Sequence, residues 1–181
     1  RGRRQRQMCI RDSFQPAEET AEGARAMLDA DLKDVIPRPD VYLGQHVLAS
    51  LPCGYVGTRP GPVLSSAFSV KVVVHGKGSH GSMPELGVDP VVLASTIVMR
   101  LQTIVSREVA AKETAVVTVG AIHAGTKSNI ITDSAELLIN TRAYNSAVSE
   151  HLKEAIERIV RAECVAARSP QEPEFTYYDR Y

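Results

Sequence analysis

Apolar and polar residues alternate most regularly in the second half of the chain. Between residues 68 and 74, apolar side chains fill every second position, and this period of two predicts a strand with one strongly buried face. Gly76 ends that strand. A β-branched run at 115–122 and an alternating run at 136–143 predict a second and a third strand, and a fourth begins within 174–181.

Two segments between these runs have the helical period instead. Asp89 and Pro90 suit the start of a helix, because the Asp side chain caps free backbone N–H groups and Pro needs no donor at the first position. The apolar stripe of this helix consists of Leu93, Ile97, Leu101, Ile104 and Val105. A second stripe consists of Val148, Leu152, Ile156, Ile159 and Val160. The outer face of the second helix carries two acid–base pairs at the favourable four-residue spacing, Glu154–Arg158 and Glu157–Arg161.

The order of these elements is β-α-β-β-α-β. This order predicts an α/β (α+β) domain of ferredoxin-like fold, in which two helices cover one side of a single sheet. The other side of the sheet and its edges would then be available to a partner.

The first third of the chain is less regular. Residues 14–64 combine a helical pattern, a short apolar strand and a Pro/Gly-rich stretch from Pro52 to Pro62, which indicates a hinge or linker. Residues 1–13 have no periodicity and contain a cluster of arginines, so we expect a foreign or disordered tail. The expected parts are therefore 1–13, 14–64 and 65–181.

Composition narrows the class of protein. The chain has 181 residues, a formal net charge of zero and a pI near 7.1, so no overall field attracts nucleic acid or an anionic membrane. No apolar run approaches the roughly 18–20 residues that a membrane-spanning helix needs. The three cysteines are odd in number and widely scattered, which argues against a disulfide framework and favours a reducing, cytoplasmic location.

Three short motifs carry candidate chemistry. Glu18 and Glu19 are adjacent carboxylates in the stretch that begins at Phe14, His46 follows in a Gly-Gln-His context, and His80 ends a Gly-Lys-Gly-Ser-His loop. One of two neighbouring carboxylates can hold a metal ion while the other moves the proton of the attacking water. The plainer readings are a solvated helix start for the glutamates, a structural or exposed role for His46, and a flexible turn around His80.

Together with Gly125–Ile131 and Asn140–Arg142, these motifs resemble the aminoacylase, hippurate hydrolase and auxin-conjugate hydrolase group of dinuclear-metal peptidases and amidohydrolases. The matching stretches cover residues 14–181 almost continuously. The resemblance implies that 14–64 is a fragment of the catalytic metal-binding domain. It also implies that 65–181 is the lid, which forms a homodimer in this family and helps to close the active site.

The resemblance also implies roles for individual residues. Glu18 would be the general base, and Glu19 and His46 would be ligands in a centre of two divalent ions, which could be zinc, manganese, cobalt or nickel. His80 would reach the partner's active site and stabilise the oxyanion. The substrate would be held by Asn129 and Arg142, with the guanidinium binding a free carboxylate.

Part of the family pattern lies outside this chain. No Cys-or-Asp-Gly-His cluster precedes Glu18, and the last His ligand is expected beyond the lid. With Glu19 and His46 alone, we expect the chain as given to hold no dinuclear centre and to be inactive, whereas its parent would cleave hippurate-like or N-acetyl amino acids.

Two other classes of protein share this order of elements. A non-catalytic dimerisation or binding module of ferredoxin-like fold remains the alternative, although it leaves the paired glutamates and the Gly76–His80 loop unexplained. RNA-recognition domains share this topology but stack bases on aromatic residues of the central strands. Aromatic content here is 5% and the net charge is zero, so we expect no nucleic-acid partner.

Overall fold

The computed structural model describes residues 10–20 and 22–178 of the chain. It divides into two compact units between Ser50 and Leu51. Most of the expected tail, and the last three residues of the expected fourth strand, lie outside the described residues. The Pro/Gly-rich stretch belongs to the second unit.

The first unit contains two short helices, α1 (Gly23–Asp29) and α2 (Leu32–Val35). No strand forms among the described residues before Ser66, so the prediction of a short apolar strand in this region is wrong. Apolar side chains of this region are exposed instead, for example Leu43 at 88% and Val47 at 85%. A single extended segment gains little without a neighbouring strand to pair its backbone groups.

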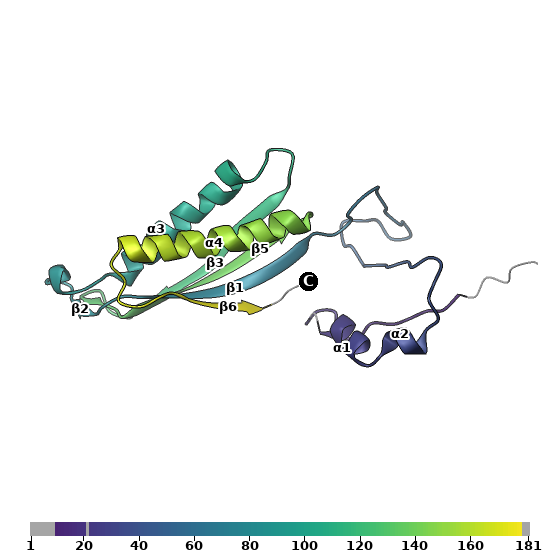
Figure 1. Ribbon diagram of the computed structural model, residues 1–181, viewed down its shortest axis with the longest axis horizontal. Helices are drawn as coiled ribbons and strands as arrows, with labels where there is room; N and C mark the ends of the chain where they lie inside the picture. Colours follow the sequence, from purple (N-terminus) through teal and green to yellow (C-terminus); the bar gives the residue numbers. More distant parts are fainter. Residues whose placement is uncertain (1–9, 21, 179–181) are drawn as a thin grey trace, which may run out of the picture. The chain divides into compact units, whose positions relative to one another are not determined.

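The second unit contains a four-stranded antiparallel sheet (Figure 1). Its strands are β1 (Ser66–His75), β3 (Ala115–Ala124), β5 (Ser134–Ala143) and β6 (Glu174–Tyr178), arranged in the order β3-β5-β1-β6. This order confirms the ferredoxin-like β-α-β-β-α-β arrangement, because the first and third strands lie side by side in the centre.

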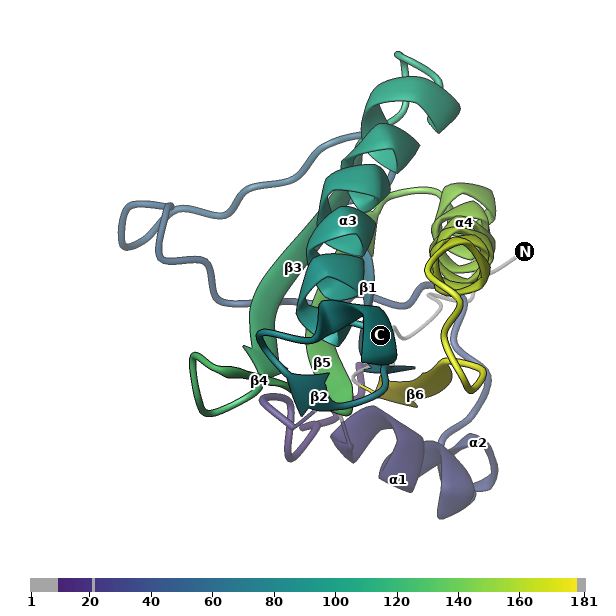
Figure 2. The ribbon, with the colours of Figure 1, turned by 90° about the vertical axis from the view of Figure 1, so that its left-hand side faces the viewer.

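Two helices, α3 (Pro90–Thr103) and α4 (Ser146–Ala166), cover one face of this sheet (Figure 2). Asp89 caps α3 as predicted, since its carboxylate accepts the backbone N–H of Val91 at 2.8 Å. Asn145 caps α4 in the same way, accepting from Ala147 N at 2.9 Å. The two caps fix where each helix begins relative to the strand before it.

The core lies between the helices and the sheet. Alternate residues of β1 and β5 point into it, and Val70, Val72, Leu137 and Ile139 are at most 1% exposed. Four members of the predicted α3 stripe are buried as well, but the fifth, Val105, is 37% exposed. The helix widens there into a π-turn, η2 (Ile104–Glu108), closed by a bond from Val109 N to Ile104 O, and the wider turn rotates Val105 away from the core.

The two acid–base pairs predicted along α4 do not form. Arg158 pairs with Glu108 of η2, and Arg161 lies 3.0 Å from Glu172. Glu157 accepts the hydroxyl hydrogen of Tyr177 at 2.6 Å. Exposed pairs within a helix contribute only about 0.3–0.5 kcal/mol, so carboxylates supplied by neighbouring elements compete readily.

Two further short strands extend from one end of the sheet, β2 (Ser79–His80) and β4 (Ile130–Ile131), with the 3-10 helix η1 (Pro84–Leu86) close by. They pair with each other to form a separate two-stranded ladder. The segments Gly76–Gly81 and Asn129–Asp133, joined by this ladder, are called the tip below.

Candidate functional site

The tip brings together two of the predicted site residues. His80 pairs with Ile130 in the β2–β4 ladder, and Gly81 N donates to Asn129 O at 2.8 Å. His80 and Asn129 therefore occupy neighbouring positions although they come from distant parts of the sequence. Both are exposed, so their side chains are accessible to a ligand.

Asp133 anchors the strand that carries His80. Its backbone oxygen accepts from Gly76 N and its carboxylate Oδ1 accepts from Gly78 N, each at 2.7 Å. A Cβ on Gly78 would stand 2.8 Å from the same Oδ1, so a larger residue here would have to displace the Asp133 carboxylate. Asp133 is not among the predicted site residues, and its place two positions after Asn129-Ile130-Ile131 is the signal in the sequence that could have found it.

The His80 imidazole is tethered on one side only. Its Nδ1 lies 2.7 Å from Ser82 Oγ and 3.2 Å from Ser82 N. Within the part of the chain described by the structure, Nε2 makes no hydrogen bond. One ring nitrogen is thus hydrogen-bonded to the protein, and the other is left without a partner among the described residues.

A cavity of about 480 Å³ opens beside His80. Charged lining residues include Lys127 and Asp133, so the pocket offers one cationic and one anionic group next to the imidazole. The remaining lining residues are small or apolar: Gly78, Ser79, Gly125, Thr126, Ile130, Ile131 and Thr132.

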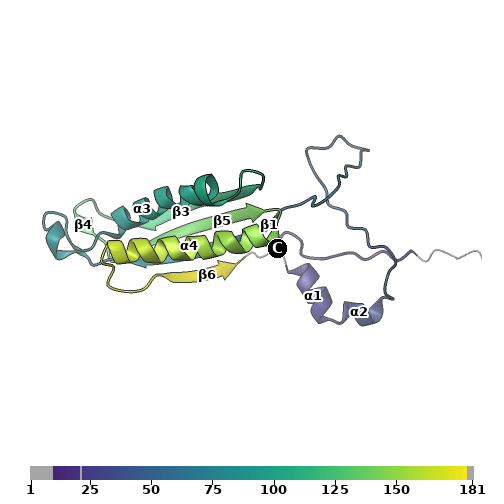
Figure 3. The same cartoon turned by 45° about the horizontal axis from the view of Figure 1, so that its top comes forward.

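Arg142 lies at the other end of the sheet. It pairs with Ala67 of β1 and Val116 of β3, near the end of β5 that is remote from the tip (Figure 3). Arg142 follows Asp133 by nine positions along this extended strand, which at about 3.4 Å per residue separates them by about 30 Å. The structure therefore does not bring Arg142 to His80 and Asn129 within one chain.

The first unit holds the other three predicted residues. His46 Nε2 lies 3.0 Å from Glu18 Oε1, and His46 Nδ1 lies 2.7 Å from Val47 O. A carbonyl oxygen only accepts, so Nδ1 carries a hydrogen and donates it. This bond, and then the Glu18 carboxylate, raise the pKa of His46 above its ordinary value, with a smaller contribution from Glu19.

This arrangement fits a metal ligand. Histidines that bind metals usually donate their other ring N–H to a carbonyl or carboxylate, which fixes the tautomer and aims the remaining nitrogen at the ion. His46 has this bond to Val47, and its Nε2 faces a carboxylate. Across residues 10–20 and 22–178, however, no group of three or more His, Cys, Asp or Glu side chains could hold a metal ion. His46 and Glu18 are therefore a contacting pair, and the described residues do not complete a metal site around them.

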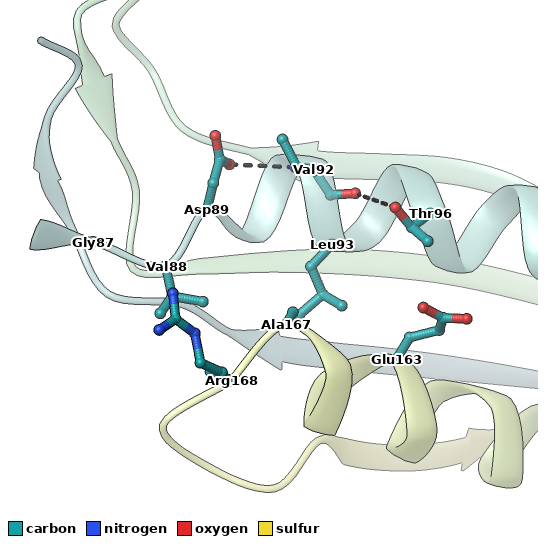
Figure 4. A pocket seen from close by; sticks show the side chains of 9 residues that line it. All are labelled: Gly87, Val88, Asp89, Val92, Leu93, Thr96, Glu163, Ala167 and Arg168. Carbon is teal, nitrogen blue, oxygen red and sulfur yellow. Dashed lines mark hydrogen bonds between the residues drawn. The ribbon is translucent and has the colours of Figure 1, made fainter. Parts of the chain in front are cut away.

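A second cavity of about 370 Å³ lies between the start of α3 and the end of α4 (Figure 4). Asp89, Glu163 and Arg168 provide its charged groups, but the Asp89 carboxylate is already used as a helix cap. None of the predicted site residues lines this cavity. None of the helices in the described part of the chain combines the length and apolar character needed to cross a bilayer.

Comparison with known proteins adds the family context. Residues 64–168 match the M20 family model described as a peptidase dimerisation domain. The chain is 34% identical over 169 residues to N-acetylcysteine deacetylase of Bacillus subtilis, covering 93% of this chain and 43% of that protein. It is 36% identical over 157 residues to thermostable carboxypeptidase 2 of Saccharolobus solfataricus, covering 86% and 39%.

Solved structures agree with this match. A crystal structure from methicillin resistant Staphylococcus aureus superimposes with a TM-score of 0.83 at 33% identity, covering 92% of this chain and 44% of that one. The YXEP protein of Bacillus subtilis, a dinuclear metal binding peptidase from the M20 family, gives a TM-score of 0.63 at 27% identity, covering 91% and 39%. The chain thus spans less than half the length of these relatives.

Proposed function

This chain belongs to the M20 family of dinuclear-metal peptidases and amidohydrolases, and from that premise we propose that the protein containing it hydrolyses the amide bond of N-acyl amino acids. The observation that carries the proposal is the contact of His46 with Glu18, in which a histidine prepared as a metal ligand faces a carboxylate. We assign residues 14–64 to the catalytic domain and 65–181 to the lid.

In the proposed mechanism Glu18, Glu19 and His46 work at one centre. When bound, two divalent ions, for example zinc, supply an acidified water and polarise the acyl oxygen. Glu19 and His46 would be ligands of these ions. Glu18 accepts a proton from the attacking water and returns it to the leaving amine, so the products are a carboxylic acid and a free amino acid.

The lid residues divide between two substrate molecules. Since about 30 Å of strand separates Arg142 from the tip, one small substrate cannot contact both in the same chain. We assign His80 to the oxyanion in the active site of a partner subunit, and Asn129, which neighbours His80, to substrate binding in that same site. Arg142, on the sheet face opposite the helices, binds the substrate carboxylate in a different active site. This division requires a homodimer.

The surface of the lid offers a place for the second copy. The strand β3 forms one edge of the sheet, and the sequence of α3 has no charged residue from Pro90 to Met99. Val92 is 61% exposed, Met99 is 72% exposed, and Ile122 on β3 is 45% exposed. An uncharged helix face beside a sheet edge is suited to pairing with an identical surface.

The names of the relatives favour small acyl groups. N-acetylcysteine deacetylase and N-acetyldiaminopimelate deacetylase, both from Bacillus subtilis, are named for N-acetyl substrates. We therefore rank N-acetyl amino acids, the substrates of an aminoacylase, ahead of hippurate-like ones. The three scattered cysteines support a cytoplasmic location.

The test uses the full product of the gene that encodes this chain. Release of free amino acid from N-acetyl amino acids and from hippurate is measured before and after removal of divalent ions with a chelator. Chelator-sensitive release supports the proposal. The competing function is a non-catalytic dimerisation module, which the match of residues 64–168 to a peptidase dimerisation domain supports. Stable dimers without any metal-dependent hydrolysis would establish that alternative.

A further inference from the structure

The hydrogen bonds at His80 define which ring nitrogen carries the hydrogen. A backbone N–H can only donate, and Ser82 N points at Nδ1 across 3.2 Å. The hydroxyl of Ser82, 2.7 Å from the same nitrogen, can donate as well. Nδ1 is therefore the acceptor, and the hydrogen of the neutral ring is on Nε2.

We propose that Ser82 is a positioning residue for His80, holding the imidazole in the Nε2–H tautomer with that group directed outward as a hydrogen-bond donor. The inference rests on the proposed function, in which His80 stabilises the oxyanion formed during amide hydrolysis. The opposite tautomer would present a lone pair to the developing negative charge, and the interaction would become repulsive.

Hydrogen bonds fix the main chain around His80, so only the orientation and tautomer of its imidazole ring remain free to change. Met83 N donates to His80 O at 2.8 Å, and Gly81 N is bound to Asn129 O. Asp133 holds the preceding glycines from the other side. With the backbone set by the ladder and the ring set by Ser82, the donor needs little rearrangement when charge develops, which is the condition for effective electrostatic stabilisation.

The structure also limits what else could hold the ring. His80 is exposed, and no packed core restricts its rotation. Among the described residues, Ser82 supplies the hydrogen bonds that reach its side chain. Removing these bonds should therefore release both the tautomer and the orientation of the ring, without opening the β2–β4 ladder, whose bonds are between backbone atoms.

The experiment is nitrogen NMR of the 181-residue chain labelled with ¹⁵N-histidine, at a pH where no imidazolium signal remains. In the wild type, His80 Nδ1 should resonate as an acceptor nitrogen and Nε2 as a protonated one. In Ser82→Ala both signals should shift toward an average of the two tautomers, and the shift should be larger in Ser82→Pro, which removes the backbone donor too. Ser82→Thr, which keeps both donors, should restore the wild-type spectrum.

His75 provides the internal control, because its Nε2 contacts Glu174 of β6 at 3.0 Å and not Ser82, and its signals should be unchanged in every variant. Amide signals of Ile130 and Ile131 report whether the ladder is intact. A wild-type ring with its hydrogen on Nδ1, or identical His80 signals in wild type and Ser82→Ala, would overturn the proposal. If Ser82→Pro disturbs the ladder, the proposal is judged from the His80 signals of Ser82→Ala compared with those of Ser82→Thr.

Kinetics on the full gene product separate this inference from the proposed function. Ser82→Ala should lower kcat with little change in KM, by less than the about hundredfold cost of removing an oxyanion donor outright. A full product that hydrolyses no N-acyl amino acid would refute the proposed function while leaving the NMR result interpretable. Normal hydrolysis with an unchanged tautomer in Ser82→Ala would refute only the role of Ser82.

Discussion

The imidazole of His46 and the carboxylate of Glu18 are held 3.0 Å apart, and the second ring nitrogen of His46 donates to Val47 O. Both contacts favour the protonated ring and raise its pKa. The proton on Nε2 occupies the nitrogen that a metal ion would bind, so protonation and metal binding compete. Metal affinity at this histidine should therefore fall as the pH falls through the raised pKa.

An NMR titration of His46 checks this directly. Its midpoint should lie above the ordinary value of about 6.5. Glu18→Gln should lower it only partway, because Val47 makes the largest contribution and remains. The free energy of folding that this pairing contributes is present below the ordinary pKa and is lost as the pH rises through the raised one. A midpoint unaffected by Glu18→Gln would contradict the contact.

The close packing at the base of the tip predicts a stability effect. A Cβ at Gly76 would stand 2.4 Å from Val88 O and 2.6 Å from Pro90 Cδ, so Gly76→Ala must displace backbone. We expect a loss of about 1–3 kcal/mol in the free energy of unfolding, measured by urea denaturation. Gly44→Ala is the matched control, since a Cβ there meets nothing within 4 Å. Equal effects of the two substitutions would contradict the described packing.

The proposed dimer surface predicts a change in assembly. Met99→Glu places a charge on the uncharged face of α3 and should shift the chain from dimer to monomer in analytical ultracentrifugation, because a buried unpaired charge is costly. Val165→Glu is the control, since Val165 is 75% exposed but lies on α4. Dissociation of the dimer by Val165→Glu, with no effect of Met99→Glu, would contradict an interface on α3 and place it on α4.

Cysteine reactivity tests the core of the lid. Cys164 is 3% exposed, and burial raises the pKa of its thiol to about 11, whereas Cys53 is exposed. In a Cys9→Ser, Cys53→Ser background, Cys164 should react with iodoacetamide far more slowly at pH 8 than the same thiol in urea. Because the folded pKa is raised, the lid should also lose stability as the pH rises from about 9 toward about 11. Fast labelling of the native chain would contradict the buried position.

The lid could be predicted in detail because its strands and helices are long and periodic. The alternation in β1 and β5 and the cap at Asp89 each follow from local sequence, and together they confirm the predicted order of elements. The π-turn that exposes Val105 has no comparable pattern in the local sequence that would predict it. The partners of Arg158 and Arg161 depend on elements that approach only in the folded chain.

The candidate site was less predictable, for two physical reasons. The ladder that joins His80 to the Asn129 segment has two residues per strand, too few to show a period. The roles of Asp133 and Ser82 rest on two local hydrogen bonds each, made by loop residues that belong to no periodic element. The separation of Arg142 from the tip, in contrast, follows from the length of β5 and could have been anticipated from the predicted strand.

The central proposal is that Glu18 moves the proton during metal-dependent amide hydrolysis. The most direct measurement is kcat together with bound metal in the full gene product, compared between wild type and Glu18→Gln. The proposal predicts that kcat on an N-acetyl amino acid falls about 10²- to 10⁴-fold while the metal content stays the same. An unchanged kcat in a Glu18→Gln protein that keeps its metal would contradict the proposal.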